Sequence, residues 1–378
     1  MKVEGFRRSL AFLVAVDRYT SGVPPLRTPI ADARALAEHL QEDHGFEVDV
    51  IADEEATLAG LRAFLAGLPG RVGADDRVAF YFAGHGVPMD GDDGPQGYVL
   101  PQDADRGSAA SFLPMAELSR ALEALPCRHL LAILDCCFAG AFRWSSGPNL
   151  AIVPDELHQE RYAWFVRDPA WQAIASAAYD QKALDVAAGE SLGVRGDAVG
   201  HSPFARALLD GLAGAADRRR ADGDDGDGVI TATELYLHLR ERLEPTPGSP
   251  RWRQTPSLWP LPKHDKGEFV FLAPGRAPDL PPAPSLDEAA NPWRGLKPYE
   301  SVHAELFFGR KRVSEDLLAR VSVEPFVVVT GPSGIEKSSL VRAGLLAPSR
   351  PQPPARRRPP WVDPVREPRV RLAGNGPG

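Results

Sequence analysis

Cysteine is scarce in this chain, which has only Cys127, Cys136 and Cys137 among its 378 residues. An odd count that includes two adjacent cysteines does not build a disulfide framework. Such scarcity is typical of a reducing compartment, where a lone thiol stays free to react. We therefore expect a cytoplasmic protein without structural disulfides.

Positive net charge and long apolar runs are also missing. The formal net charge is −8 and the pI is about 5.7, whereas a nucleic-acid partner needs a basic face for its phosphates. No segment approaches the ~20 apolar residues of a membrane span, and the apolar run at residues 10–16 is only long enough for a strand. We therefore expect no nucleic-acid partner, no membrane partner and no signal peptide.

The residues that are present predict a large folded core. Hydrophobic residues make up 43% of the chain and charged residues 25%, and short apolar runs alternate with helical periodicity between residues 9 and 272. This alternation indicates an α/β domain with a largely parallel sheet. We expect strands at residues 9–16, 46–51, 76–82, 130–134, 171–176 and 268–272. We expect helices at residues 30–40, 57–68, 115–125, 203–213 and 232–243, with a small hairpin arm at 97–100.

The composition changes near residue 273, and this change divides the chain. We expect the α/β domain to span residues 1–273 and a stiff, proline-rich linker that packs poorly to follow at 274–290. A second unit at 291–347 is too short for a complete nucleotide-binding domain. Residues 348–378 are rich in proline and arginine, and we expect them to form a disordered tail.

A histidine and a cysteine about 50 residues apart are the strongest functional signal. His85 follows the predicted strand at 76–82, and Cys137 follows the predicted strand at 130–134. Parallel strands deliver the residues that follow them to the carboxyl-terminal edge of the sheet, where ligands and catalytic groups gather. An imidazole that activates a thiol for nucleophilic attack fits this arrangement.

Small residues around both motifs support a catalytic interpretation. Gly84, Gly86 and Gly140 let a substrate carbonyl approach the backbone, so the amides of Gly86 and Cys137 are candidate oxyanion donors. The alternative is that the two adjacent cysteines only fill a core, as free cysteines often do. Placement at a strand end beside a Gly-His-Gly sequence favours catalysis.

These motifs resemble the caspase and metacaspase superfamily, in particular the bacterial caspase-like peptidases. The similarity covers residues 9–272 and rests on AFLVAVDRY, PIADARALAEHL, FYFAGHG, LAILDCCFAG, IASAAYDQKALD and HSPFARALLDGL. It implies a caspase-type three-layer α/β sandwich with a mostly parallel six-stranded sheet, and a cysteine endopeptidase with His85 as base. The family motif Asp-x-Cys-x-x-Gly makes Cys137, not Cys136, the nucleophile, although Phe138 and Ala139 stand where the family often has His and Ser.

The residue two positions before the nucleophile predicts which bond is cut. Animal caspases have glutamine there and read a P1 aspartate with arginines, whereas this chain has Asp135. A carboxylate repels aspartate and attracts Arg or Lys through charge-assisted bonds. The metacaspase resemblance adds Asp32 as a second pocket carboxylate, and Ser176 is a further candidate at the end of its strand. For Asp32 the alternative is a first-turn carboxylate that favours the helix dipole, and both interpretations stay open.

Two acidic loops are candidates for calcium, which would act as an activator, since no cofactor is expected to be required. In the loop at 222–234, Asp225, Asp227 and Glu234 stand at positions three, five and twelve of an EF-hand pattern. Gly223 occupies position one, where a ligand is needed. The alternative is a solvated acidic turn in which Thr231 caps the next helix. The loop at 90–93 resembles the loop that is tied to calcium activation in metacaspases.

The second unit resembles the start of a STAND-type NTPase. Its phosphate loop would use Gly331, Lys337 and Ser338, but Glu336 stands where a P-loop requires glycine before the lysine. We therefore expect a truncated, degenerate unit that does not hydrolyse ATP.

The leading hypothesis is a caspase-like cysteine endopeptidase that acts on proteins or peptides after Arg or Lys. Self-processing at Arg143 or at the arginines 218–220, and oligomerisation, are further expectations. One rival is a non-proteolytic signalling adaptor that uses the same fold for binding or assembly. Another is a small-molecule enzyme on a flavodoxin-like sheet, but residues 16–19 lack the glycine-rich turn that it needs.

Overall fold

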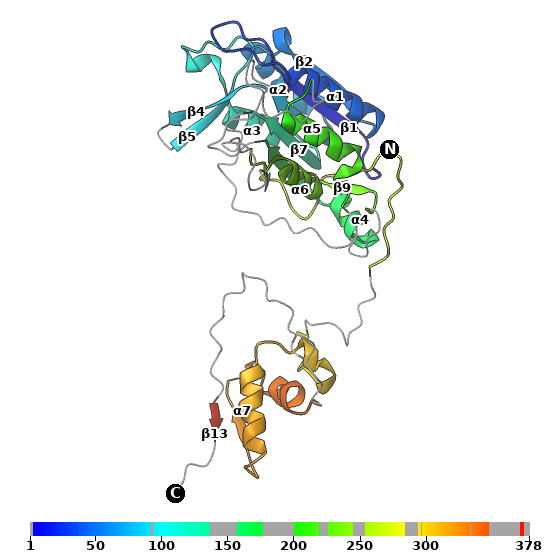
Figure 1. Cartoon of the computed structure of the whole chain (residues 1–378), viewed down its shortest axis with the longest axis vertical. Helices are drawn as coiled ribbons and strands as arrows, with labels where there is room; N and C mark the ends of the chain where they lie inside the picture. Colours follow the sequence, from blue (N-terminus) through cyan, green and yellow to red (C-terminus); the bar gives the residue numbers. More distant parts are fainter. Residues whose placement is uncertain are drawn as a thin grey trace. The chain divides into compact units, whose positions relative to one another are not determined.

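The computed structural model describes residues 3–91, 94–136, 157–176, 200–218, 226–244, 254–283, 294–295, 297–332, 334–347 and 371–373 (Figure 1). Its contacts divide the chain into two compact units, residues 1–283 and 284–378. Each unit is described by itself.

A six-stranded sheet forms the centre of the first unit, in the order β10-β8-β7-β3-β1-β2. Five strands are parallel, and β10 pairs antiparallel with β8 at one edge. Every residue of β1, β3 and β7 is buried, as expected for strands that are covered on both faces. The bounds are β1 Ser9–Ala15, β2 Glu47–Ala52, β3 Arg77–Ala83, β7 His129–Asp135, β8 Ala170–Ala175 and β10 Ser257–Pro260.

Helices cover both faces of this sheet, so the first unit is the three-layer sandwich that the sequence predicted. One core lies between the sheet and α2 and α3, and the other lies between the sheet and α1, α5 and α6. The smaller helix α4 packs with Val3 and β11 in a third apolar cluster. The bounds are α1 Pro29–Glu42, α2 Leu58–Arg71, α3 Met115–Glu123, α4 Gln159–Arg167, α5 Pro203–Asp210 and α6 Ala232–Leu243.

The sixth strand of the sheet is not the one expected. The apolar run at 268–272 contains β11 (Val270–Leu272), which pairs with β9 (Val229–Thr231) in a separate two-stranded sheet. The edge position belongs to β10, which follows Pro256 and ends at Pro260 and for which no strand was predicted from the sequence. Proline is tolerated on an edge strand because its missing N–H is not needed there, so the prediction was wrong at this place.

A three-stranded antiparallel sheet follows β3 and includes the expected hairpin arm. It consists of β4 (Gly86–Gly91), β5 (Gly94–Val99) and β6 (Leu113–Pro114). In Figure 1, β4 and β5 project from the body of the first unit. Two short 3₁₀ helices, Asp53–Glu55 and Ala109–Ser111, lie in the loops of the same unit.

Residues 274–283 belong to the first unit, which corrects the expectation of a linker from 274 onward. Asp279 donates its N–H to the carbonyl of Asp227, and Gln159 donates its N–H to the carbonyl of Pro281. Leu280 packs against the cluster beside α4. Proline prevents helix and inner-strand formation here, but it leaves carbonyls that can accept bonds from a neighbouring surface.

The second unit is small and mostly helical among its described residues. Its elements are a 3₁₀ helix Ser301–Leu306, α7 Lys311–Val321, β12 Val328–Thr330, α8 Lys337–Ser339, a π-type turn Leu340–Leu345 and β13 Arg371–Ala373. The strand β13 pairs antiparallel with β12. Residues 371–373 were expected to be part of a disordered tail, so this strand corrects that expectation for them.

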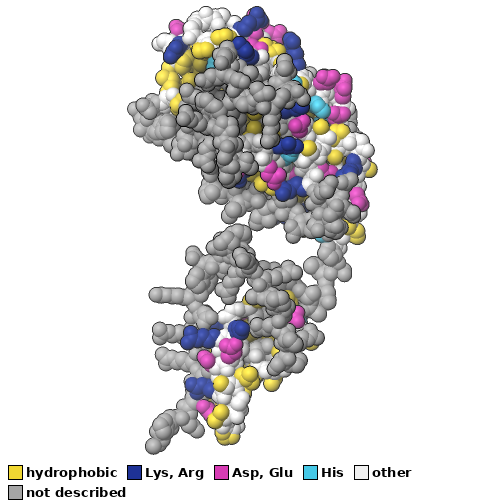
Figure 2. All heavy atoms as spheres, in the orientation of Figure 1, with side chains coloured by type: hydrophobic (Ala, Val, Ile, Leu, Met, Phe, Trp, Pro, Cys, Tyr) yellow, Lys and Arg dark blue, Asp and Glu magenta, His cyan; other side chains and the backbone are white. Residues whose placement is uncertain are grey.

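Charged side chains of both signs are interspersed on the face of the first unit that Figure 2 shows, with no separate basic patch among the described residues of that face. Among the helices that the structure describes, none is both long and apolar enough to cross a membrane.

Candidate active site

The two predicted motifs leave neighbouring strands at the same edge of the sheet. β3 and β7 pair in parallel with Ala83 opposite Asp135, and Gly84 donates its N–H to the Asp135 carbonyl at 3.3 Å. His85 therefore stands next to the end of β7, where the two cysteines follow. The described part of that segment ends at Cys136.

Several predicted residues lie outside the described residues. These are Cys137, Asp225, Arg143 and the arginines 219–220, together with 92–93 of the first acidic loop. Arg218 is described, and its guanidinium pairs with Glu241 at 3.1 Å.

The ring of His85 is half-buried and held on two sides. Its Nε2 lies 2.9 Å from the carbonyl oxygen of Pro24, and its ring lies against Tyr19 with the centroids 5.0 Å apart. Because a carbonyl oxygen can only accept, Nε2 carries the proton in the neutral ring, and Nδ1 keeps its lone pair. The backbone N–H of His85 donates to the Tyr19 hydroxyl at 2.9 Å. This arrangement fixes the tautomer that a general base at Nδ1 requires.

Tyr19 and Pro24 were missed as site residues because their signals are weak. Both lie in the loop between β1 and α1, and Pro24 acts through a backbone carbonyl, which any residue could supply. Tyr19 ends the motif AFLVAVDRY, where Asp17 and Arg18 separate it from the apolar run. Burial raises the pKa of Tyr19, so its hydroxyl stays protonated at neutral pH.

Gly86 has a backbone N–H that the neighbouring hairpin does not use. Gly86 lies opposite Val99, and the N–H of Leu100 donates to the carbonyl of His85 at 3.0 Å. This register makes Gly86 and Val99 a non-hydrogen-bonded pair of the antiparallel ladder. The Gly86 N–H therefore points away from β5, as an oxyanion donor must.

Cys136 is fully buried in the core on the side of α2 and α3. Cys127 is buried in the same cluster, and burial raises its pKa to about 12. A buried thiol with a raised pKa is a poor nucleophile. Neither described cysteine is placed to attack a substrate.

Asp135 and Asp32 meet on the opposite face of the sheet, where Ser202 bridges them. The hydroxyl of Ser202 donates to Asp135 at 3.0 Å, and its backbone N–H donates to both carboxylate oxygens of Asp32 at 3.2 and 3.3 Å. His201 Nδ1 donates to Asp32 at 2.7 Å. Asp32 is 1% exposed and Asp135 is 8% exposed. The structure thus brings the two predicted carboxylates to one buried site.

The hydrogen bonds of Asp32 extend both to another element and to Thr28 at the start of its own helix. Burial raises the pKa of Asp32 even though His201, Ser202 and Thr28 donate to it. Ser202 also caps α5, because its hydroxyl oxygen accepts the N–H of Ala205 at 3.0 Å. His201 and Ser202 belong to the motif HSPFARALLDGL, but the sequence did not assign them a role.

Two buried hydroxyls at this edge have no hydrogen-bond partner among the described residues: those of Tyr81 and Ser176. Burial raises the pKa of Tyr81 well above its usual value, and the charges of Asp135 and Asp32 raise it further. Ser176 ends the run of β8, and its backbone N–H donates to Leu134 on β7. Since unsatisfied buried polar groups are rare, both hydroxyls mark hydrogen-bonding capacity that a ligand could use.

The acidic loop at 222–234 shows a capped helix in its described half. Thr231 and Glu234 form a reciprocal capping box, in which Glu234 accepts the Thr231 N–H at 2.9 Å and Thr231 Oγ1 accepts the Glu234 N–H at 3.0 Å. Asp227 accepts the N–H of Val229 at 2.9 Å. Within the described residues, no group of three or more His, Cys, Asp or Glu side chains is arranged to hold a metal ion. The contacts of Glu234 fit the capping alternative.

The predicted phosphate loop precedes α8 (Lys337–Ser339), and its lysine bonds to the loop's own backbone. Lys337 donates to the carbonyls of Gly331 and Pro332, both at 2.8 Å, so its amine is bound by the loop itself. Glu336 has φ of +61°, a left-handed conformation that favours glycine. Ser338 is exposed in α8.

Comparisons with known proteins agree with these two units. A family model described as Caspase domain matches residues 8–261. This chain belongs to the caspase domain family. A model described as Novel STAND NTPase 1 matches residues 292–375 of this caspase-domain protein, and that range runs through the region expected to be a tail.

One solved structure, of protein GSU0716 from Geobacter sulfurreducens, is similar with a TM-score of 0.43 and 15% identity, covering 73% of this chain and 98% of that chain. No curated protein matches this sequence.

Proposed function

We propose that the first unit is a cysteine endopeptidase in which His85 is the general base and Cys137 is the nucleophile. The single observation that carries this proposal is the His85 ring, which Pro24 holds in the tautomer that leaves Nδ1 free of a proton. Membership of the caspase domain family supports a peptidase in general. The burial of Cys136 supports Cys137 as the reactive thiol of the pair.

The proposed reaction assigns each of these groups a step. His85 Nδ1 takes the thiol proton as the sulfur of Cys137 attacks the scissile carbonyl, and the imidazolium then gives this proton to the leaving amine. The N–H groups of Gly86 and Cys137 stabilise the oxyanion of the tetrahedral intermediate. Water, activated by the same Nδ1, releases the acyl group and restores the thiol.

We further propose that Asp135, Asp32 and Ser176 form a pocket for a P1 Arg or Lys. The pocket carries two carboxylates at one buried place, and His201 donates to one of them, Asp32. A guanidinium or ammonium group entering the pocket would form charge-assisted hydrogen bonds to these carboxylates. Ser176 and Tyr81 would supply hydroxyl partners to the bound side chain.

The second unit fits assembly better than nucleotide turnover. Its match to a STAND NTPase domain supports a role in oligomerisation, whereas Glu336 and the bound amine of Lys337 count against a working phosphate loop. We place the protein in the cytoplasm, where a reducing environment keeps a nucleophilic thiol free. Its expected partners are protein or peptide substrates.

Fluorogenic peptides that end in Arg, Lys or Asp test this function. The purified chain should cleave after Arg and Lys, with and without added Ca²⁺, and the Cys137→Ala variant should not cleave at all. Cys136→Ala is the matched control, because it removes the neighbouring thiol from the core and should keep activity. If the wild-type chain cleaves no peptide, the adaptor function becomes the better account; cleavage after Asp alone would reject the pocket.

A further inference from the structure

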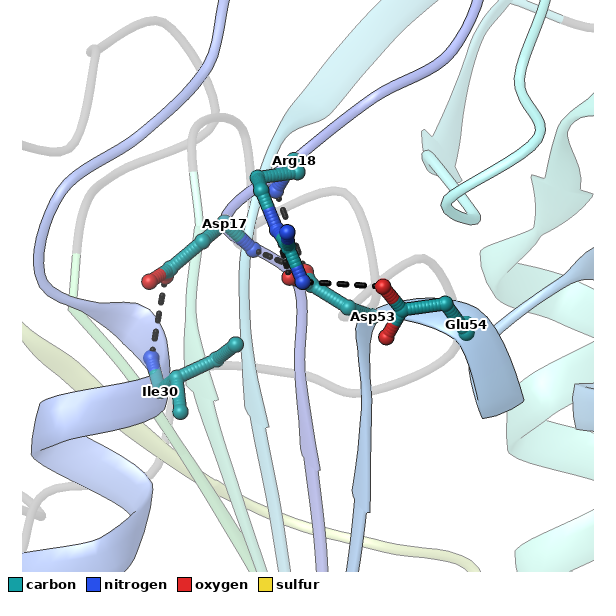
Figure 3. Close-up of polar contacts among 5 residues, drawn as sticks. All are labelled: Asp17, Arg18, Ile30, Asp53 and Glu54. Atoms are coloured by element: carbon teal, nitrogen blue, oxygen red, sulfur yellow. Dashed lines mark hydrogen bonds and ion pairs between the residues drawn. The ribbon is translucent and has the colours of Figure 1, made fainter.

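Asp53 is a buried carboxylate at the carboxyl end of β2, away from the proposed dyad and its pocket. It is 2% exposed and begins the 3₁₀ helix Asp53–Glu55. Its Oδ1 accepts the backbone N–H of Asp17 at 2.9 Å and that of Arg18 at 3.0 Å, and its Oδ2 accepts Nε of Arg18 at 2.7 Å (Figure 3). One side chain thus fixes two consecutive residues of another segment.

The backbone of Asp53 is itself in an unfavourable conformation. Its φ of +37° lies in the left-handed region, where non-glycine residues are rare. Such a conformation persists only where surrounding contacts enforce it, and it is concentrated at functional sites. Burial alone would raise the pKa of Asp53, but the bonds from Arg18 and Asp17 outweigh it and hold the pKa below its usual value. The carboxylate is therefore charged at neutral pH.

The segment that Asp53 holds is the loop that orients His85. Asp17 and Arg18 lead directly to Tyr19, which contacts the His85 ring, and to Pro24, whose carbonyl accepts from Nε2. Asp17 also ties the far end of this loop, since its carbonyl accepts the N–H of Leu26 at 2.8 Å and its side chain accepts the N–H of Ile30 at 3.0 Å (Figure 3). A shift at Asp17 would therefore move both groups that hold the histidine.

We propose that Asp53 is a positioning residue for the reaction: its carboxylate fixes the backbone of Asp17 and Arg18, and through this loop it fixes the tautomer and angle of His85. The proposal rests on the proposed function through the role of His85. Displacing a reacting group by about 1 Å can cost about 100-fold in rate, so a loop this close to the base is a sensitive place. Asp135 ends β7 and Ser176 follows β8, so most of the P1 pocket lies on elements that Asp53 does not hold, and KM should change less than kcat.

Asp76 provides a matched control at the opposite edge of the sheet. It is also buried, pairs with Arg8 at 2.6 Å and accepts the backbone N–H of Gly73 at 2.8 Å. Its loss should lower stability in the same way as the loss of Asp53, but it lies at the amino end of β3 and does not hold the loop that orients the His85 ring. The two carboxylates therefore separate a general structural role from a positioning role.

The test compares Asp53→Gly, Asp53→Asn and Asp76→Gly in the full chain. Asp53→Gly relieves the backbone but removes all three acceptor contacts, and we expect kcat to fall about 10- to 100-fold with KM changed less than about threefold. Asp53→Asn keeps an acceptor oxygen and tolerates the left-handed backbone, so it should recover most of the rate. Asp76→Gly should keep the wild-type kcat. Wild-type kcat in Asp53→Gly would overturn the proposal.

A second measurement does not depend on cleavage. The ¹⁵N and ¹³C shifts of the His85 ring report its tautomer, which should be Nε2–H in the wild type and in Asp76→Gly but mixed in Asp53→Gly. Should Asp53→Gly fail to fold, Arg18→Met replaces it, because Arg18 is 69% exposed; we expect a loss of about two- to fivefold in kcat and a partly mixed tautomer. If the folded variant keeps the wild-type tautomer, the positioning role is rejected. If the wild type cleaves no peptide but the His85 tautomer still changes in the variant, only the peptidase function is rejected.

Discussion

Replacing Asp135 with asparagine should remove the preference for basic P1 residues without unfolding the protein. The amide has the same size as the carboxylate and can still accept the Ser202 hydroxyl, which lies 3.0 Å away. The change therefore removes a negative charge at constant shape. Asp32 would stay in place, because His201 and the Ser202 N–H hold it.

The size of the effect follows from the burial of the pair. Asp135 is 8% exposed, so a bound guanidinium would be largely desolvated beside it. Truncating one partner of a buried, hydrogen-bonded charge pair costs about 2–5 kcal/mol. At about 1.4 kcal/mol per factor of ten, kcat/KM for a P1 Arg peptide should fall about 30-fold to several thousand-fold. Asp32→Asn should have a smaller effect, since His201 and the Ser202 N–H already donate hydrogen bonds to it.

The assay uses the ratio of two substrates, which cancels any general loss of activity. Peptides that end in arginine and in its neutral analogue citrulline are cleaved by the wild type, by Asp135→Asn and by the control Asp76→Asn. We expect the arginine-to-citrulline ratio of kcat/KM to collapse in Asp135→Asn alone. A ratio that stays at the wild-type value would refute the assignment of Asp135 to the pocket.

Three further predictions concern stability. Burial raises the pKa of Glu234 from 4.5 to about 7, so between pH 4.5 and 7 the native state binds a proton that the unfolded state lacks. The free energy of unfolding should therefore fall by up to about 3 kcal/mol as pH rises through this window. Urea titrations should show this slope in the wild type and not in Glu234→Gln. Tyr19→Phe leaves the His85 N–H without its acceptor and should cost about 1–3 kcal/mol in the same titrations, whereas no loss would contradict the bond. Glu336→Gly relieves a left-handed residue and should stabilise the second unit by about 1 kcal/mol in calorimetry of the full chain, and a destabilised unit would contradict this reading of its backbone.

The elements of the first unit were largely predictable, because apolar runs and helical periodicity determine them locally. β1, β3 and β7 are buried on both faces, so each appears in the sequence as a continuous apolar run. The helix α6 occupies the residues that its periodicity predicted, and Thr231 begins it with a capping box. The edge strand β10 was missed because its prolines are acceptable only at an edge, and edge position is a tertiary property.

The site was predictable only where a residue acts through its side chain and belongs to a recognisable motif. His85 and Asp135 could be predicted from their residue types and from their positions at strand ends. Pro24 acts through its backbone carbonyl, and Asp53 acts through a loop that is far from it in the sequence. Neither contribution can therefore be seen in a sequence pattern. Tyr81 lies inside an apolar run, and its register opposite β7 is what places its hydroxyl near the carboxylates.

Covalent labelling tests the central claim most directly. The full chain would be treated with a peptidyl acyloxymethyl ketone that ends in Arg, digested, and examined by mass spectrometry for the modified residue. We predict one adduct, on Cys137, that is lost in His85→Ala and that the matching Asp reagent does not form. An adduct on Cys136 or Cys127 instead, or none at all in the wild-type protein, would contradict the proposed dyad.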